Sequence, residues 1–176
     1  VTRDVTSGKL ANRSLSKKQK AIFLDRDGVL NYDTDLIHRT EDFTLYDYTA
    51  ETLKRINQSD YLAIVITNQS IIARGLTNLK GLDDIHKKME WELGESQAFV
   101  DAIYFCQHHP HAGFEGEVPE FKVECTCRKP KPGMILEAAE RFNIDLSQSF
   151  MIGDSERDAG AGRAAGVTTI GVRTGH

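Results

Sequence analysis

The sequence predicts an α/β fold in which a doubly wound parallel sheet carries helices on both faces. Short apolar runs of strand length alternate with segments in which apolar residues have helical spacing. This alternation is typical of a parallel sheet whose strands are joined by helices. Three polar residues, Asp25, Thr67 and Asp154, each follow an apolar run directly or end it. Ligands of such sheets bind beyond the carboxyl ends of the strands, so we expect one shared site there.

The individual elements follow from local patterns along the chain. The expected strands are residues 21–24, 61–66, 102–105, 149–152 and 167–172. The expected helices are residues 50–58, 77–93, 132–142 and 156–165. Leu53 and Ile56 have helical spacing, and Pro132 opens the third helix at a position where its missing N–H donor is harmless. Residues 106–132 form a long loop that holds all three cysteines and all four prolines.

The chain of 176 residues suits one globular domain with a core of its own. Residues 1–19 are polar without a sustained apolar period, so we expect a tail or linker there and the folded domain over residues 20–176. The chain begins with Val1 rather than Met, which suits a fragment, a processed product or one domain of a fused pathway enzyme.

Composition and charge exclude several functional classes. Hydrophobic residues make up 40% and charged residues 27% of the chain, which is not the composition of a disordered protein. A net charge of -4 argues against broad nucleic-acid binding, which needs a basic face. No apolar run reaches the roughly 20 residues of a membrane helix, and the N-terminus lacks the apolar core of a secretory signal. We therefore expect a cytoplasmic protein, a monomer, without nucleic-acid or membrane partners.

The segment DRDGVLN, residues 25–31, carries two carboxylates just past the first expected strand. Asp25 and Asp27 could share a magnesium ion, which prefers hard oxygen ligands. A carboxylate can also attack phosphorus, and a second carboxylate can move the protons that this reaction requires. A solvated turn is the plain alternative. A calcium loop of the EF-hand type is excluded because its glycine stands sixth, whereas Gly28 is fourth.

Three further motifs are individually weaker. Thr67 and Asn68 end an apolar run and could hold phosphoryl oxygens, although such pairs also cap helices. Residues 128–133 supply an arginine and two lysines that could offset phosphate charge, although a solvated basic turn has the same composition. Asp154 could complete a metal site, with Asp158 one helical turn later on the same face, although acidic residues also favour helix starts.

The long loop carries a candidate zinc site. Cys106 is followed, after a histidine and a longer stretch, by Cys125 and Cys127. Three cysteines and a histidine satisfy tetrahedral zinc, and a closed set of four protein ligands indicates a structural rather than a catalytic ion. Free buried cysteines beside a surface histidine are the alternative. His108, His109 and His111 compete for the fourth position.

Taken together, the motifs resemble the four signature motifs of the haloacid-dehalogenase (HAD) superfamily of phosphatases, over roughly residues 20–173. The segments DRDGVLN, VITNQS, CRKPKPGM and MIGDSERDAGAGRAAG are most similar to the D-glycero-D-manno-heptose 1,7-bisphosphate phosphatase family. Histidinol-phosphate phosphatases share the first two motifs and the zinc loop. They usually lack the Pro-Gly-Met that stands here as Pro132, Gly133 and Met134, so the heptose family is the closer match.

The resemblance implies a role for each motif residue. Asp25 is the implied nucleophile, Asp27 the general acid and base, and Thr67 and Lys129 the holders of the phosphoryl oxygens. The implied magnesium ligands are the Asp25 side chain, the Asp27 backbone carbonyl and Asp154. The implied zinc ligands are Cys106, His108, Cys125 and Cys127. Asp158 is implied to orient Lys129 or a water on the metal.

Substrate contacts are implied as well. They are Asp33, Thr34, Asp35, Leu36, Thr67, Asn68, Gln69, Ser70, Arg128 and Lys129. Arg128 is the implied partner of a second phosphate. No insertion is long enough for a large cap domain, so the zinc loop is expected to form a wall of the cleft. Ile71 departs from the family, which usually has Gly there, and a β-branched residue at a positive φ would be strained.

The expected activity is magnesium-dependent hydrolysis of a small sugar phosphate through a phospho-aspartate. The resemblance names the C7 phosphate of D-glycero-D-manno-heptose 1,7-bisphosphate as the target and structural Zn²⁺ as a second metal. Histidinol-phosphate phosphatase is the alternative enzyme. A catalytically inactive, zinc-stabilised binding domain is the alternative of another class, against which the complete set of acid, base, lysine and metal ligands argues.

Overall fold

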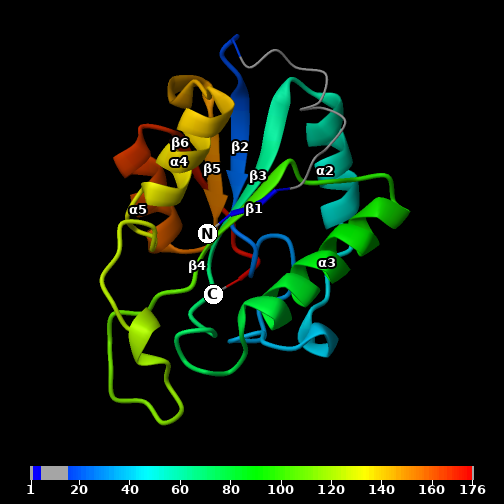
Figure 1. Cartoon of the computed structure of the whole chain (residues 1–176). Coiled ribbons are helices and arrows are strands. Elements are labelled where there is room, and N and C mark those ends of the chain that lie inside the picture. The colour runs from blue at the N-terminus through cyan, green and yellow to red at the C-terminus, as the bar shows by residue number, and fades with distance from the viewer. Residues whose placement is uncertain (1, 5–15, 176) are drawn as a thin grey trace.

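The computed structural model describes residues 2–4 and 16–175, which form one six-stranded sheet in the order β1-β4-β3-β2-β5-β6. The strands are β1 Thr2–Asp4, β2 Lys20–Leu24, β3 Tyr61–Asn68, β4 Ala102–Cys106, β5 Phe150–Gly153 and β6 Thr168–Gly171. Strands β2 to β6 are parallel to their neighbours, and β1 pairs antiparallel with β4 (Figure 1). The predicted doubly wound parallel sheet is confirmed.

Helices cover both faces of the sheet, with α2 and α3 on one face and α4 and α5 on the other (Figure 1). The α-helices are α2 Thr49–Gln58, α3 Leu79–Glu95, α4 Gly133–Phe142 and α5 Glu156–Ala165. Short 3-10 helices lie at η1 Thr40–Asp42, η2 Pro119–Phe121 and η3 Leu146–Gln148. In the buried part of β3, alternate side chains join opposite cores: Ile64 packs toward α4, and Val65 packs toward α2 and α3. A run buried on both faces reads as continuously apolar, as the sequence of β3 does.

The topology places β2 at the centre of the sheet, between β3 and β5. The chain proceeds from β2 through β3 to β4 on one side and returns through β5 to β6 on the other. The strand order therefore reverses beside β2, and such a reversal creates a crevice at the carboxyl ends of the strands. Asp25 follows β2, and Asp154 follows β5. Thr67 is the second-last residue of β3.

Part of the predicted tail belongs to the sheet. Residues 2–4, which the sequence analysis assigned to a tail or linker, form the edge strand β1 and pair with β4 in the register Thr2 to Tyr104. An edge strand is held by backbone hydrogen bonds, so it does not need the apolar pattern that reveals a buried strand. Most of the remaining tail, residues 5–15, lies outside the described residues.

Within the described ranges, no helix combines the length and hydropathy that a membrane crossing requires.

Candidate active site

The cavity at the carboxyl ends of the strands has a volume of about 270 Å³. It brings together the motif residues that are far apart in the sequence. Its lining includes Asp25, Asp27, Thr67, Arg128, Lys129, Asp154 and Asp158. The four motifs thus meet in one place. This agrees with the expectation that polar residues at the carboxyl ends of the strands form one shared site.

Asp25 lines this cavity beside a buried cation, Lys129. Its Oδ1 lies 2.8 Å from Lys129 Nζ and accepts a hydrogen bond from the Arg26 backbone N–H at 2.7 Å. Burial raises the pKa of Asp25 to about 7, although the positive charge of Lys129 opposes this shift. The lysine therefore compensates only part of the cost of burying this carboxylate.

Lys129 is fixed from three directions. Its Nζ donates to Asp158 Oδ1 at 2.6 Å and to the Ile66 carbonyl at 2.9 Å, in addition to its contact with Asp25. Burial by itself lowers the pKa of Lys129, but the carboxylates of Asp25 and Asp158 outweigh it and the net shift is upward. Lys129 therefore stays charged, which suits a group that offsets phosphoryl charge.

Asn68 ties the backbone of Lys129 to the end of β3. Its side-chain amide donates to the Lys129 carbonyl at 3.1 Å, and its side-chain oxygen accepts from the Lys129 N–H at 3.0 Å. This paired contact joins residues that are 61 positions apart. Asn68 lines the cavity, as predicted, and it also sets the position of Lys129.

The carboxylate of Asp27 is held by several donors. Gln69 Nε2 donates to Asp27 Oδ2 at 2.9 Å and to Thr67 Oγ1 at 2.8 Å. Because the amide donates to the Thr67 oxygen, the hydroxyl hydrogen of Thr67 is left to point elsewhere. Gln69 is 2% exposed, so it links two predicted site residues from a buried position.

Asp25, Asp154 and Asp158 form a cluster whose carboxylate oxygens lie within 4.8 Å of one another. This donor set fits magnesium, a hard cation that binds one or two carboxylates and retains waters. Asp158 is the member least suited to be a ligand, because its Oδ1 accepts from Lys129 and its Oδ2 accepts from the Ser155 hydroxyl at 2.6 Å. The Asp27 carboxylate lies outside this cluster, and only the backbone carbonyl of that residue is predicted to reach the metal.

Gly28 allows the close approach of Asp154. It has a φ of 79°, and an added Cβ would lie 2.3 Å from Asp154 Oδ2 and 2.9 Å from the Cα of Gly175. The backbone near Gly175 is fixed in turn, since the Thr174 hydroxyl donates to the Gly28 carbonyl at 2.6 Å. A side chain at this position would displace the predicted magnesium ligand.

Magnesium binding to this cluster should depend on pH. The metal binds an ionised carboxylate, whereas the raised pKa of about 7 means that Asp25 holds a proton below that pH. Binding then has to release this proton, so the apparent Mg²⁺ affinity should fall as the pH is lowered through about 7. Calorimetric titration with Mg²⁺ on both sides of this pH measures the effect. Asp25→Asn is the control and should bind weakly with little pH dependence; a constant affinity in the unaltered protein would contradict the prediction.

Three arginines surround the cavity, and the sequence analysis singled out only one of them. Arg74, Arg128 and Arg157 all line it. Burial lowers the pKa of Arg128, and repulsion from Arg157 and Arg74 adds to that shift. Guanidinium groups remain charged at any ordinary pH, so their mutual repulsion favours binding of an anion between them. Arg157 lies inside the fourth motif, whereas nothing local in the sequence marks Arg74.

The segment from Asp33 to Leu36 lies along the cavity with one exception. Asp33, Asp35 and Leu36 line it, whereas Thr34 is exposed and does not. The segment turns sharply because the Asp35 N–H donates to Asp33 Oδ1 at 2.9 Å and both Asp35 and Leu36 have positive φ, 64° and 45°. Thr34, a predicted substrate contact, therefore lies outside the lining of this cavity.

Ile71 is accommodated without the strain that a positive φ would cause. It is not among the described non-glycine residues with positive φ, and its side chain is 1% exposed. It packs with Ile72, Leu82 and Phe105 in a small apolar cluster beside the cavity. Ser70, a predicted substrate contact in the same turn, lines the cavity as expected.

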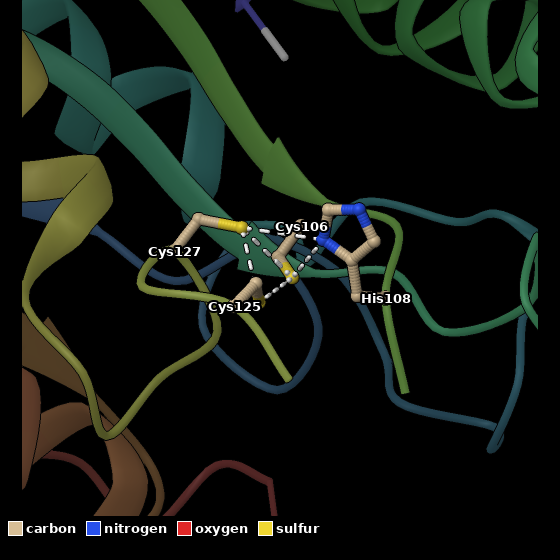
Figure 2. Close-up of side chains that lie close together, drawn as sticks. All are labelled: Cys106, His108, Cys125 and Cys127. Atoms are coloured by element: carbon tan, nitrogen blue, oxygen red, sulfur yellow. Dashed lines mark hydrogen bonds between the residues drawn. The ribbon is translucent and has the colours of Figure 1, made fainter. Parts of the chain in front are cut away.

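The predicted zinc ligands converge from β4 and the long loop, and Figure 2 shows their side chains pointing toward one another. The Sγ–Sγ distances are 3.6 Å for Cys106–Cys125, 3.3 Å for Cys106–Cys127 and 3.3 Å for Cys125–Cys127. His108 Nδ1 lies 3.7 Å from Cys106 Sγ and 3.5 Å from Cys127 Sγ. Tetrahedral zinc with usual bond lengths separates such ligand atoms by about 3.5–3.8 Å. The four residues therefore fit zinc, and all three cysteines are free of disulfides.

His108, rather than His109 or His111, belongs to this cluster among the described residues. His109 Nε2 lies 3.3 Å from Arg74 Nη2, and its Nδ1 lies 3.1 Å from the His111 carbonyl. The predicted zinc ligands also contact the cavity wall, because Arg128 Nη1 donates to the His108 carbonyl at 3.0 Å. This contact connects the cluster directly to one of the three arginines.

Comparison with known proteins agrees with the geometry. A HAD-hydrolase-like family model matches residues 126–176. The D-glycero-beta-D-manno-heptose-1,7-bisphosphate 7-phosphatase of Escherichia coli K12 is 39% identical over 162 residues, 92% of this chain and 83% of that protein. The protein of the same name from Haemophilus ducreyi is 42% identical over 159 residues, 89% of this chain and 85% of that protein.

A crystal structure of D,D-heptose 1,7-bisphosphate phosphatase from B. bronchiseptica, complexed with magnesium and phosphate, has the same fold. Its TM-score is 0.79 at 37% identity, over 89% of this chain and 82% of that one. The predicted HAD resemblance and the phosphatase assignment are confirmed, and residues 16–175 contain no large cap domain, as expected. The chain therefore belongs to the D-glycero-beta-D-manno-heptose-1,7-bisphosphate 7-phosphatase family of HAD phosphatases.

Proposed function

We propose that this phosphatase removes the C7 phosphate of D-glycero-D-manno-heptose 1,7-bisphosphate, with Asp25 as the nucleophile. The observation that carries the proposal is the position of Asp25, which lines the cavity in contact with Lys129 and beside Asp154. A nucleophilic carboxylate, a fixed cation and a metal-binding carboxylate are the parts that phosphoryl transfer through an acyl phosphate requires.

The reaction proceeds in two steps. The Asp25 carboxylate attacks phosphorus while the bond from phosphorus to the sugar oxygen breaks, and Asp27 gives its proton to that oxygen. Asp27 then takes a proton from water, which attacks the phospho-aspartate and releases phosphate and free Asp25. Lys129 and the Thr67 hydroxyl stabilise the phosphoryl oxygens in both steps. Magnesium held by Asp25, Asp154 and the Asp27 carbonyl supplies further positive charge when it is bound.

The three arginines support a substrate with a second phosphate. Arg74, Arg128 and Arg157 lie on the cavity wall in addition to Lys129. Lys129 binds the phosphate that reacts, so the arginines are available for another anion. Arginine binds phosphate oxygens with two parallel hydrogen bonds, so this group suits an anion at the far end of a small sugar. A monophosphate would leave the repulsion among these side chains without compensation.

The cysteine cluster serves the same site as a structural zinc centre. It is closed by four protein ligands, and Arg128 and Lys129 follow Cys127 in the chain. Zinc needs thiolates, and reducing compartments preserve them, so the proposal places the enzyme in the cytoplasm.

Turnover with Mg²⁺ on three phosphate esters tests the proposal. We expect the highest kcat/KM on D-glycero-D-manno-heptose 1,7-bisphosphate, a much lower value on histidinol phosphate and a measurable rate on an aryl phosphate. Phosphate release should stop after one equivalent per heptose bisphosphate, which shows that a single position is cleaved. A preference for histidinol phosphate would show that the enzyme is a histidinol-phosphate phosphatase instead. Inactivity on all three would indicate a binding domain.

Asp27→Asn should lower turnover by removing proton transfer. Positioned acid–base catalysis contributes about 10²–10⁴-fold, and the loss in kcat/KM should approach this range on the sugar phosphate. Nitrophenyl phosphate has a leaving group that needs no proton, so its kcat/KM should fall much less. The ratio of the two losses is the measurement, and equal losses would contradict the role of Asp27 as the general acid.

A further inference from the structure

We propose that His86 and Arg26 form a buried pair that positions the Asp27 carboxylate, so that His86 is a positioning residue for proton transfer. His86 lies on α3 and does not line the cavity. The inference rests on the proposed role of Asp27 and extends it to residues that do not touch the substrate.

Arg26 is buried completely, with 0% exposure, although it stands between two residues that line the cavity. Its Nε donates to Asp27 Oδ1 at 2.9 Å, and its Nη2 donates to Asp27 Oδ2 at 3.0 Å. The guanidinium also lies over the Phe43 ring, 5.7 Å from the ring centroid. A paired, two-point contact of this kind fixes the plane of a carboxylate as well as its position.

His86 completes the surroundings of the guanidinium. Its Nε2 lies 3.3 Å from Arg26 Nη1, and its ring is 1% exposed. Arginine carries donors and no acceptor, so this contact is a hydrogen bond when His86 Nε2 accepts. A buried arginine that loses an acceptor leaves a charged donor without a partner, and relief of that cost requires the side chain to shift.

A shift of Arg26 is transmitted to Asp27 because the carboxylate is held by a balance of donors. Each of its oxygens receives one bond from Arg26, and the second bonds come from Asn31 Nδ2 to Oδ1 at 3.0 Å and from Gln69 Nε2 to Oδ2 at 2.9 Å. If Arg26 moves, Asn31 and Gln69 pull the carboxylate toward their own positions. Gln69 also bonds to Thr67, so the displacement reaches the predicted phosphoryl site.

The test compares two substitutions of similar size at His86. His86→Leu removes the acceptor, whereas His86→Gln provides an amide oxygen that can accept from Arg26. We expect His86→Leu to lower kcat/KM on the sugar phosphate by about tenfold or more, a fraction of the acid–base contribution, with a clearly smaller loss on nitrophenyl phosphate. His86→Gln should recover most of the rate. Met89→Leu, a buried position on the same helix, is the control for general loosening of the core. It should leave kcat/KM unchanged on the sugar phosphate and on nitrophenyl phosphate.

The outcomes separate the inference from the function on which it depends. An equal loss on both substrates, or no loss in His86→Leu, overturns the positioning role. If Asp27→Asn itself lacks the dependence on leaving group, the proposed role of Asp27 fails instead. Should His86→Leu not fold, as judged by thermal unfolding, His86→Asn replaces it, because its shorter amide reaches less far toward Arg26. His86→Asn must then lose more kcat/KM on the sugar phosphate than on nitrophenyl phosphate, and His86→Gln must not show this difference.

Discussion

Asp25→Asn is expected to abolish turnover while the protein stays folded. The amide cannot attack phosphorus, and it is a poor ligand for magnesium, so covalent catalysis and metal binding are lost together. The rate should fall by several orders of magnitude. This is the largest effect that we expect from a single substitution, because the bond-forming atom itself is removed.

The fold should tolerate this change because of the surroundings of Asp25. Burial raises the pKa of this carboxyl to about 7, which reflects the cost of a charge at this position, and Asn has nearly the same shape without the charge. Lys129 retains its bonds to Asp158 and to the Ile66 carbonyl. The unfolding temperature of the variant should therefore equal or exceed that of the unaltered protein.

Kinetics and thermal unfolding of the purified variant measure both parts of this prediction. Asp60→Asn is the matched control, since the Asp60 side chain is 88% exposed and its ion pair with Lys20 is long, at 4.0 Å. It should keep full turnover. Near-normal activity of Asp25→Asn would show that another residue is the nucleophile, whereas an unfolded variant would contradict the expected tolerance.

Loss of the proposed zinc centre is expected to have the second largest effect. The double substitution Cys125→Ser/Cys127→Ser, or stringent chelation, removes two ligands or the metal itself. A loop of about twenty residues then has to be ordered without the free energy of metal binding. Arg128 Nη1 bonds to the carbonyl of His108, so this cation loses a direct support. Lys129 comes next in the chain, so the backbone that leads to it loses a restraint as well.

Turnover should fall sharply in the double variant, and added Mg²⁺ alone should not restore it. Elemental analysis measures the zinc content and kinetics measures the turnover of the same samples. We expect about one zinc ion per chain in active protein. His111→Asn is the matched control, because His111 lies in the same loop but outside the cluster. It should keep both its zinc and its activity. Zinc-free protein with full activity would overturn the claim that this metal organises the site.

The strands and the motif chemistry were predictable because their signals are local. The parallel strands β2 to β5 are largely apolar runs, and the residues that follow such strands stand at the sheet edge where ligands bind. The positions of Asp25, Thr67 and Asp154 in one cavity therefore followed from the order of elements. The grouping of Cys106 with Cys125 and Cys127 followed from the occurrence of all three cysteines in one segment.

Other features depended on contacts between segments that have no mutual signal in the sequence. Strand β1 is held to β4 by backbone hydrogen bonds. Any segment can form such bonds whatever its side chains are, so composition could not reveal this strand. Arg74 joins Arg128 and Arg157 at the cavity only because the turn after β3 lies beside the long loop and α5.

The sequence by itself determined the class of reaction of this protein, and it predicted the nucleophile and the types of metal that the side chains can bind. The tertiary structure alone decided how those groups are oriented, as in the contact of Arg26 with His86, 60 residues away. The physical reason is that reactivity belongs to a side chain and its immediate neighbours. Orientation belongs to the packing of distant segments, in which buried polar groups must find their partners across the fold.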